Sequence, residues 1–415
     1  MQTLFDKINS HHAGLLPSKV ARKYKLLTEN AFCFFRGTNQ LFYEDLNYEA
    51  LPHSPVCWIC GDLHIENFGS YKGDNRLVYF DLNDFDESIL APVSWELVRM
   101  LTSMLVGFDA LKITDKQAKK ACELFLKKYT KVLADGNPGY IETRTATGIV
   151  KRFLNSIEER SDKKLLAKRT LKKNGILQLS SGKDKQLIID KQLKRNLIKV
   201  FKKWMKSNNQ PPNDYKVLDA RFRLAGTGSM GISRYLFLIE KIGDPGKHML
   251  IDMKQAKRSS LKPFVNVPQP NWESESHRMV TIQKTMQNIP PAQLSTLYFR
   301  GESYLMQELQ PTKDRINFEM IQHDFEVVCS VIEDMAMITA SAHLRSVGRM
   351  GSCIADELIS FGQDNSWHAG LINYATSYKK KIISDYKEFK AILKAKKIKL
   401  HKQDAITIKE KKVAV

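Results

Sequence analysis

The order of the secondary-structure patterns is the feature that most constrains the fold of this chain. Between residues 215 and 256, apolar runs alternate with Gly and Pro turns, which predicts an antiparallel sheet with a hairpin turn at 243–246. On either side of this block, residues 95–108 and 324–347 carry apolar side chains at helical spacing. A β-rich middle between two helix-rich parts predicts an α+β fold in which a β domain interrupts a helical domain.

The same patterns divide the 415 residues into five parts. We predict an N-terminal extension over 1–55, a first helical part over 56–210, a β-rich part over 211–312, a second helical part over 313–395 and a basic tail over 396–415. Within these parts, apolar strands at 56–60 and 76–80 indicate a hairpin-like unit, and a further helix is predicted over 273–288. The Lys-rich stretch 151–206 has apolar residues at irregular helical spacing.

Positive charge is concentrated in two segments of the chain. The formal net charge is +20, and residues 151–206 hold 18 Lys or Arg against 5 Asp or Glu, while residues 379–415 hold 13 against 4. Such segments suit nucleic acid or a membrane surface as a partner. However, 151–206 offers few aromatic side chains for base stacking, and a Lys-rich helix is usually a solvated face.

The sequence favours neither secretion nor membrane spanning. No basic leader followed by an apolar core opens the chain, and no run of about 18 apolar residues is free of charge. Six scattered cysteines do not suggest a disulfide framework and fit a reducing compartment. Cys57 and Cys60 form a single CxxC, for which a buried strand is favoured over a zinc site because a second ligand pair is missing. We therefore expect a cytoplasmic protein, whose oligomeric state the sequence leaves open.

Two polar loops carry the residue types that phosphoryl transfer requires. Residues 61–67 read GDLHIEN, and an acidic cluster of Asp81, Asp84 and Asp86 follows the next apolar strand. In phosphoryl transfer one carboxylate accepts or orients the attacking hydroxyl, while an Asn and a second carboxylate hold Mg²⁺ against the nucleotide phosphates. The spacing predicts a metal and nucleotide site here, although acidic loops also serve commonly as turns and helix caps.

A glycine-rich loop and a lysine lie in the β-rich part. The loop matches GxGxxG and consists of Gly226, Thr227, Gly228, Ser229, Met230 and Gly231. A Rossmann fingerprint would run straight into a helix, whereas this loop is followed by a strand, a turn and a second strand that carries Lys254. This layout resembles a kinase N-lobe, in which backbone N–H groups of the loop cover the phosphates of ATP and the lysine holds the α and β groups. The alternative for Lys254 is a solvated lysine at a sheet edge.

The GDLHIEN loop resembles the HGDLHxxN catalytic loop of the aminoglycoside phosphotransferase and choline kinase group within the protein-kinase-like superfamily. NDFDES at 83–88 resembles the IDFDDA metal motif of that group. The resemblance implies that Asp62 is the catalytic base, that Asn67 is a metal ligand and that Asp84 is the main metal aspartate, with Asp81 as its rival. The sequence departs from the motif at Cys60, where the group has a histidine.

The resemblance also implies roles for the neighbours of these residues. His64 is either a packed loop histidine that supports Asp62 or a direct participant in catalysis. In kinases the strand lysine pairs with a glutamate of the next helix, for which Glu273, Glu275 and Gln283 are the candidates here. The strand YLMQEL at 304–309, with Glu308, resembles the one that leads to the kinase hinge, where backbone groups bind adenine.

These motifs occur in inverted order, because kinases place the glycine loop before the catalytic loop. Residues 340–345 resemble the LARLHA helix that normally precedes HGDLH, so a circular permutation accounts for the order. The implied fold is bilobal and protein-kinase-like, with a β-rich N-lobe inserted between two halves of a helical C-lobe. The glycine loop should then face the acidic cluster, and helix 334–346 should pack beneath the catalytic loop. The whole pattern, including FFRG near the start, also resembles a bacterial family of unknown function.

We therefore expect an enzyme with ATP and Mg²⁺ as cofactors that phosphorylates a hydroxyl or amine of a small molecule. Its partners would be the nucleotide and an acceptor molecule that the sequence does not identify. Both anionic and uncharged acceptors stay open. A small-molecule acceptor is favoured over a protein because no APE-like string follows Asp84. Two alternatives stay open: transfer of AMP instead of phosphate, and a degenerate kinase core that binds nucleic acid or a membrane surface.

Overall fold

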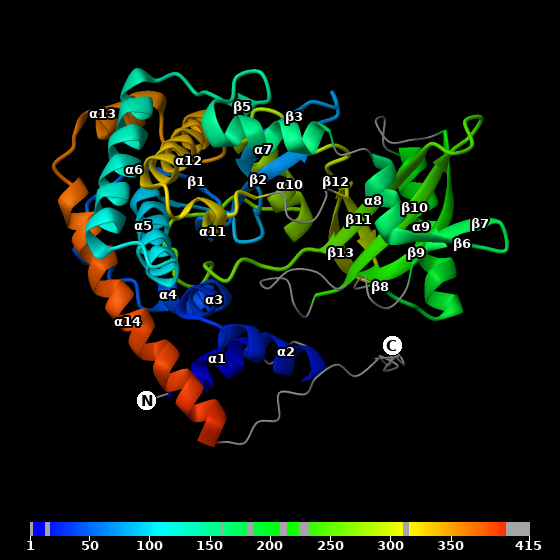
Figure 1. The fold of residues 1–415 in the computed structure, drawn as a ribbon, viewed down its shortest axis with the longest axis horizontal. Coiled ribbons are helices and arrows are strands. Elements are labelled where there is room, and N and C mark those ends of the chain that lie inside the picture. Colours follow the sequence, from blue (N-terminus) through cyan, green and yellow to red (C-terminus); the bar gives the residue numbers. More distant parts are fainter. Residues whose placement is uncertain are drawn as a thin grey trace.

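The middle of the chain forms a six-stranded antiparallel sheet, and segments from both ends of the chain form a helical region beside it (Figure 1). The computed structural model describes residues 3–12, 17–159, 162–180, 186–207, 214–223, 232–309 and 315–395. The order of helices, then sheet, then helices confirms the mixed α+β class that the sequence patterns predict.

The six-stranded sheet has the strand order β12-β13-β11-β10-β9-β8. Its strands and the two helices that belong to it are β8 (Gln186–Leu187), α9 (Lys191–Ser207), β9 (Tyr215–Arg223), β10 (Arg234–Lys241), β11 (His248–Gln255), α10 (Glu275–Met286), β12 (Ser295–Phe299) and β13 (Glu302–Glu308). The predicted hairpin turn joins β10 to β11. Its glycines, Gly243 and Gly246, have φ values of 82° and 107°, which residues with a side chain rarely adopt.

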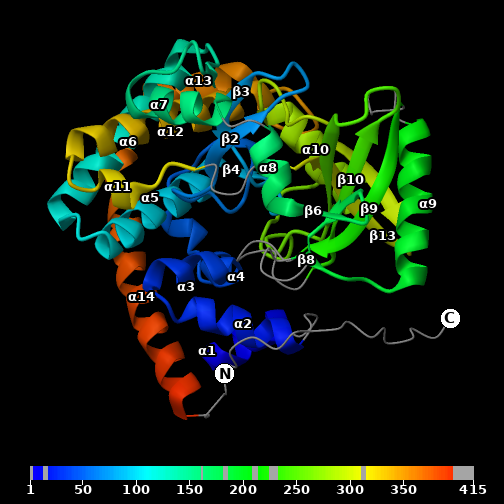
Figure 2. The same cartoon turned by 45° about the vertical axis from the view of Figure 1, so that its right-hand side comes forward.

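The helices α9 and α10 cover opposite faces of this sheet (Figure 2). Neighbouring residues of β13 show the alternation: Met306 packs in the apolar cluster of α9, whereas Leu305 packs with Met279 of α10. Lys254 lies opposite Leu305 in the β11–β13 pair. The lysine is therefore held on a central strand of the sheet rather than at its edge.

The basic stretch 151–206 contains more strand than its helical spacing predicts. Beyond β8 and α9 it forms α7 (Gly148–Glu158), α8 (Asp162–Arg169), β6 (Thr170–Lys173) and β7 (Ile176–Leu179). The sequence places the boundary between the first helical part and the β-rich part at residue 210. In the structure α9 already packs on the six-stranded sheet, since Phe201 of α9 stacks on Phe237 of β10 with ring centroids 4.2 Å apart. Lys202 and Lys203 on the other side of α9 are exposed, as a solvated basic face would be.

Both ends of the chain contribute to the helical region. Its helices are α1 (Leu4–His12), α2 (Pro17–Leu27), α3 (Ala31–Gly37), α4 (Asn39–Glu44), η1 (Tyr48–Ala50), α5 (Val93–Ala110), α6 (Asp115–Asp135), α11 (Phe318–Ile321), α12 (Phe325–Ser346), α13 (Ala355–Gln363) and α14 (His368–Ala395). Among the described residues, α12 is the one helix long and apolar enough to cross a membrane, with a mean hydropathy of 1.4. Because 67% of that apolar window is buried inside the protein, packing in the core accounts for its composition.

Two small sheets carry the polar loops that the sequence singles out. They consist of β1 (Val56–Ile59) with β4 (Ile89–Pro92), and of β2 (Phe68–Lys72) with β3 (Val78–Leu82) and β5 (Ile141–Glu142). The prediction that strands 56–60 and 76–80 belong to one hairpin-like unit is wrong, because each pairs with a different strand. The partner strands β2 (FGSYK) and β4 (ILAP) are difficult to predict because they are short and lack a clear apolar alternation.

The two halves of the helical region meet at Glu96 of α5, which is fully buried. One carboxylate oxygen accepts hydrogen bonds from the backbone N–H of Gly61 at 3.0 Å and from the Cys60 thiol at 2.8 Å. The other lies 2.8 Å from Nε2 of His343 on α12, whose Nδ1 in turn contacts the hydroxyl of Tyr129 at 2.8 Å. Helix α12 therefore lies against the loop that begins at Gly61, as the order of the motifs predicts.

Replacing Glu96 by alanine should lower the free energy of unfolding by about 3–5 kcal/mol, because the buried partners lose their acceptor. Urea denaturation followed by circular dichroism measures the change. The exposed Glu123 of α6 provides the control, since Glu123→Ala should change stability by less than about 0.5 kcal/mol. Equal losses in the two variants would show that Glu96 does not join the halves.

Candidate active site

Gly61 allows the chain to leave β1 sharply and to present Asp62. Its φ of 79° lies in the region that favours glycine, and a Cβ here would lie 2.3 Å from the carbonyl oxygen of Glu87. The hydroxyl of Tyr43 donates a hydrogen bond to the Gly61 carbonyl at 2.8 Å, and the backbone N–H of Ile65 donates to Ser103 Oγ at 2.9 Å. The loop is therefore fixed from α4 and from α5.

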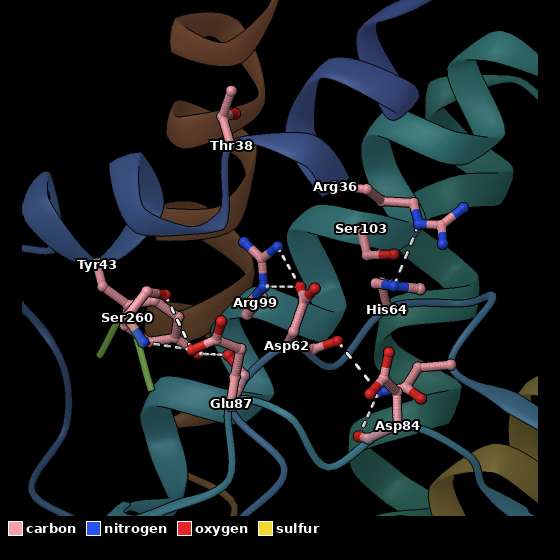
Figure 3. Close-up of polar contacts among 12 residues, drawn as sticks. Arg36, Thr38, Tyr43, Asp62, His64, Asp84, Glu87, Arg99, Ser103 and Ser260 are labelled. Carbon is pink, nitrogen blue, oxygen red and sulfur yellow. Dashed lines mark hydrogen bonds and ion pairs between the residues drawn. The ribbon is translucent and has the colours of Figure 1, made fainter. Parts of the chain in front are cut away.

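Arg99 of α5 holds the carboxylate of Asp62 (Figure 3). Its Nε donates to Asp62 Oδ1 at 2.9 Å, and Nη2 donates to the same oxygen. The guanidinium is fully buried and lies over the rings of Phe35 and Phe42, with centroids 4.2 and 5.0 Å away. Both bonds fall on Oδ1, so they fix the orientation of the carboxylate.

Burial raises the pKa of Asp62, and the adjacent Arg99 partly offsets that effect. A carboxylate with a raised pKa is a stronger base than a solvated one, which suits a group that must take a proton from a hydroxyl. The side chain is 25% exposed, so the carboxylate remains accessible.

His64 packs inside the loop. Nε2 lies 3.2 Å from Nε of Arg36, Nδ1 lies 3.1 Å from the backbone nitrogen of Glu66, and the ring meets Phe32 edge-on. Only one nitrogen of a neutral imidazole accepts a hydrogen bond, so the ring accepts from one of these two donors at a time. Burial, followed by the charges of Arg36 and two other arginines, holds the pKa of His64 well below its usual value. A neutral imidazole fixed by its neighbours favours the supporting role over direct catalysis.

Asn67 joins the two polar loops. Its Nδ2 donates to the backbone carbonyls of Asp62 and Asp84, each at 3.2 Å. Its Oδ1 is buried and has no hydrogen-bond partner among the residues that the structure describes. Buried polar atoms of this kind are uncommon and call for an explanation, and a cation would supply one.

Lys254 of β11 reaches the acidic loop from the six-stranded sheet. Its Nζ lies 3.5 Å from Asp84 Oδ1 and also forms an ion pair with Asp86. Burial acts against the charge on Lys254, but the two carboxylates outweigh it and raise the pKa of the ammonium. Partial desolvation acts against the ionised form of Asp84, whose side chain is 56% exposed, but Lys254 outweighs this effect and lowers the pKa of the carboxyl. Both partners are thus charged at neutral pH.

Among the described residues, no side chain of the predicted helix 273–288 forms an ion pair with Lys254. Glu275 of α10 accepts instead from Arg278 Nε at 2.7 Å, and Glu273 lies 4.0 Å from His277. Lys254 forms its ion pair with Asp86 instead.

Asp81, the rival of Asp84, lies on β3 and is 6% exposed. Tyr71 forms a hydrogen bond with it and Arg345 lies near it, whereas Lys254 pairs with Asp84 and Asp86. Burial, partly offset by Arg345, raises the pKa of Asp81 to about 6. The structure therefore groups Asp62, Asn67 and Asp84 with Lys254 and leaves Asp81 apart from them.

Glu308 is the one remaining residue of the predicted nucleotide site that lies in the described ranges, and it is placed less favourably. The side chain of Glu308 pairs with Arg76, and its backbone N–H donates to the Ala292 carbonyl at 2.8 Å, so neither group is available to an adenine ring. The glycine loop, with Gly226, Thr227, Gly228, Ser229 and Gly231, lies outside the described residues. Its predicted role stays a prediction.

Three residues at the site were assigned no role from the sequence: Arg99, Arg36 and Glu87. Arg99 stands in a largely apolar helix, and such a buried charge signals a buried partner. Arg36 lies in the FFRG string and pairs with Glu66. Glu87 accepts from the backbone N–H of Ser260 at 2.6 Å, and burial raises its pKa to about 7 despite that bond.

The raised pKa of Asp81 predicts a pH dependence of stability. Its folded-state pKa of about 6 exceeds the value of about 3.9 in an unfolded chain, so folding favours the neutral form. The folded protein therefore loses stability as the pH rises from about 4 to about 6. Asp81→Asn should remove this loss and raise the free energy of unfolding at pH 7 by about 1–3 kcal/mol.

Urea denaturation at intervals between pH 4 and pH 8 tests this prediction. The exposed Asp244 provides the control, because Asp244→Asn should keep the wild-type profile. A profile for Asp81→Asn that runs parallel to the wild type would contradict the assignment.

Comparison with known proteins gave one result. The searches of curated proteins and of solved structures each found no match. A family model described as "Uncharacterized protein conserved in bacteria (DUF2252)" matches residues 15–392, a range that contains every residue of the site described above. The match spans most of the chain, and the protein therefore belongs to this family.

Proposed function

We propose that this protein is an ATP- and Mg²⁺-dependent phosphotransferase that acts on a hydroxyl or amine of a small molecule. The observation that carries the proposal is the contact of Lys254 with Asp84, next to Asn67 and its unpartnered Oδ1. These groups come from parts of the chain that are far apart in sequence. A cation, a metal-binding carboxylate and an amide oxygen in one place are what the phosphates and metal of a nucleotide require.

We further propose a bilobal protein-kinase-like fold in circularly permuted order, with the six-stranded sheet as the N-lobe. The chain after α12 supports this proposal, because the backbone N–H of Cys353 donates to the Val56 carbonyl at 2.8 Å. In addition, Trp58 Nε1 donates to the Arg349 carbonyl at 3.1 Å. The end of α12 thus lies beside the strand that enters the catalytic loop, where an unpermuted chain would connect the two directly.

Asn67 Oδ1 and Asp84 are the protein groups that would hold Mg²⁺. Mg²⁺ usually takes one or two carboxylates, with waters and substrate phosphates as further ligands, so a set this small fits it. No cluster of three or more His, Cys, Asp or Glu side chains suited to a metal occurs in the described part of the chain, which disfavours an all-protein metal cage. When bound, the ion would neutralise charge on the transferred phosphoryl group.

In this proposal Asp62 acts on the acceptor. Its Oδ2 would take the proton of the acceptor hydroxyl as the oxygen forms a bond to the γ-phosphorus. The bond from this phosphorus to the β–γ bridging oxygen breaks, and ADP leaves. Arg99 fixes the direction of the carboxylate, and Lys254 offsets negative charge on the phosphates.

Asp62→Asn should lower turnover by about a thousandfold and leave the affinity for MgATP within about threefold of wild type, because an amide cannot take the proton. The assay follows transfer of label from γ-labelled and from α-labelled ATP to a pool of small metabolites. Label from the γ position in the product supports phosphoryl transfer, and label from the α position would establish AMP transfer instead. Asp244→Asn is the control and should have wild-type turnover.

Asp84→Ala should abolish Mg²⁺-dependent ATP binding, and Lys254→Met should weaken it by about ten- to a thousandfold, since each removes a charge set against the metal or the phosphates. Titration calorimetry with and without Mg²⁺ measures both effects. Asp81→Asn serves as the control, because its side chain lies with Tyr71 and Arg345. Loss of ATP binding in Asp81→Asn together with normal binding in Asp84→Ala would show that Asp81, not Asp84, is the metal-binding aspartate.

A further inference from the structure

Cys57 of β1 and Cys353, which follows α12, lie with their sulfur atoms 3.1 Å apart. Both are free thiols, and one of them donates a hydrogen bond to the other. The sequence favours a buried strand for the CxxC of Cys57 and Cys60, and in the structure these two cysteines have different partners. The thiol of Cys60 donates to Glu96, whereas Cys57 faces the distant Cys353.

The backbone holds the two cysteines side by side. The N–H of Cys353 donates to the Val56 carbonyl at 2.8 Å. On the other side of Cys57, Nε1 of Trp58 donates to the Arg349 carbonyl at 3.1 Å. A disulfide bond needs its sulfur atoms about 2.05 Å apart, so bond formation here requires an approach of only about 1 Å.

The two thiols differ in access and in acidity. Cys57 is fully buried, whereas Cys353 is partly exposed. The hydrogen bond with Cys57 lowers the pKa of the Cys353 thiol, although burial acts against this effect. The same contact, together with burial, raises the pKa of Cys57. Because the thiolate is the reactive form of a cysteine, Cys353 is the thiol that meets an oxidant and Cys57 is the one that completes a bond.

The other four cysteines do not share these features. Cys33 and Cys329 are also partly exposed, but burial raises the pKa of each thiol. Cys60 and Cys122 are buried, and their thiols face oxygen atoms of other residues. Within the described ranges, the thiol pair of β1 and the segment after α12 is the one place where two cysteines are in contact.

We propose that Cys57 and Cys353 form a reversible disulfide bond when the protein meets a peroxide, and that this bond locks the end of α12 to β1. Strand β1 ends at Ile59, directly before the loop that carries Asp62, so the lock acts on the strand that presents the candidate base. In reducing compartments such bonds are usually transient and serve redox sensing. The inference does not depend on the proposed phosphotransferase activity, because it uses only the two thiols.

The bond forms in two steps. The thiolate of Cys353 attacks one oxygen of hydrogen peroxide, the O–O bond breaks, and the products are a sulfenic acid and hydroxide, which takes up a proton to become water. The sulfur of Cys57 then attacks that of Cys353 and displaces hydroxide, which leaves as water with the proton of the Cys57 thiol. The two sulfur atoms together lose two electrons, which the peroxide accepts. A dithiol reductant reverses the change, because its thiolate attacks the disulfide and the reductant ends as a disulfide itself.

Thiol mapping of the full-length protein tests the proposal. The reduced protein is treated with hydrogen peroxide, the remaining thiols are alkylated, and unreduced peptides are identified by mass spectrometry. We expect one intramolecular bond, between Cys57 and Cys353, which dithiothreitol breaks in the folded protein. Because the two residues are 296 positions apart, the bond closes a long loop in the unfolded chain and should raise the thermal midpoint by about 2–5 °C.

Two variants test which thiol reacts first. In Cys57→Ser the second thiol is missing, so the sulfenic acid of Cys353 should persist and be labelled by dimedone. In Cys353→Ser no label is expected at Cys57, because that side chain is buried. Cys329→Ser is the matched control, since Cys329 is also partly exposed, and it should form the bond as wild type does.

The proposal is overturned if peroxide leaves both thiols free in the wild type, or if the mapped bond joins another pair of cysteines or two molecules. A bond that forms without a rise in the thermal midpoint would overturn the lock. Dimedone label at Cys57 in Cys353→Ser, without label at Cys353 in Cys57→Ser, would overturn the assignment of Cys353 as the thiol that meets the oxidant. The measurements on the wild type decide the proposal even if a variant fails to fold.

Discussion

Two buried charged residues on one turn of α5, Glu96 and Arg99, hold the loop on which the site depends. Glu96 accepts the backbone N–H of Gly61 and contacts His343 of α12, while Arg99 donates to Asp62. Buried charges are tolerated only when their hydrogen-bonding capacity is largely met, so the loop and helices can assemble in few ways. The position of the candidate base is in this way set by the core of the helical region.

The acidic loop is fixed in a similar way from the six-stranded sheet. Arg278 of α10 donates from Nη1 to the Ser88 carbonyl, and from Nη2 to the carbonyls of Asp86 and Lys257 at 2.8 and 3.1 Å. An arginine with several carbonyl partners orients a loop more firmly than a single ion pair does. Arg278 and Lys254 together hold the acidic loop against the six-stranded sheet. Helix α10 contributes this arginine, although it supplies no glutamate to Lys254.

The N-terminal helices have a larger part in the site than their sequence indicates. Residues 1–55 were predicted to be an extension, yet Phe35 and Phe42 cover the guanidinium of Arg99, and Tyr43 holds Gly61. The aromatic residues of FFRG and LFY thus shield the Arg99 guanidinium from water, while the side chain of Asp62 stays 25% exposed. In a low-dielectric setting the pairing of Arg99 with Asp62 is stronger than it would be at the surface.

The sequence by itself determined the mixed class, the order of helical and β-rich parts, the hairpin at Gly243–Gly246 and the residue types of the two polar loops. These depend on periodicity, on turn residues and on short motifs, which are local properties of the chain. It did not determine that β1 pairs with β4, that α9 belongs to the sheet, or that Asp84 rather than Asp81 meets Lys254. Pairing and burial between distant segments depend on which surfaces fit together, and only the tertiary structure decided that Arg99 and Asp86 would become the partners of Asp62 and Lys254.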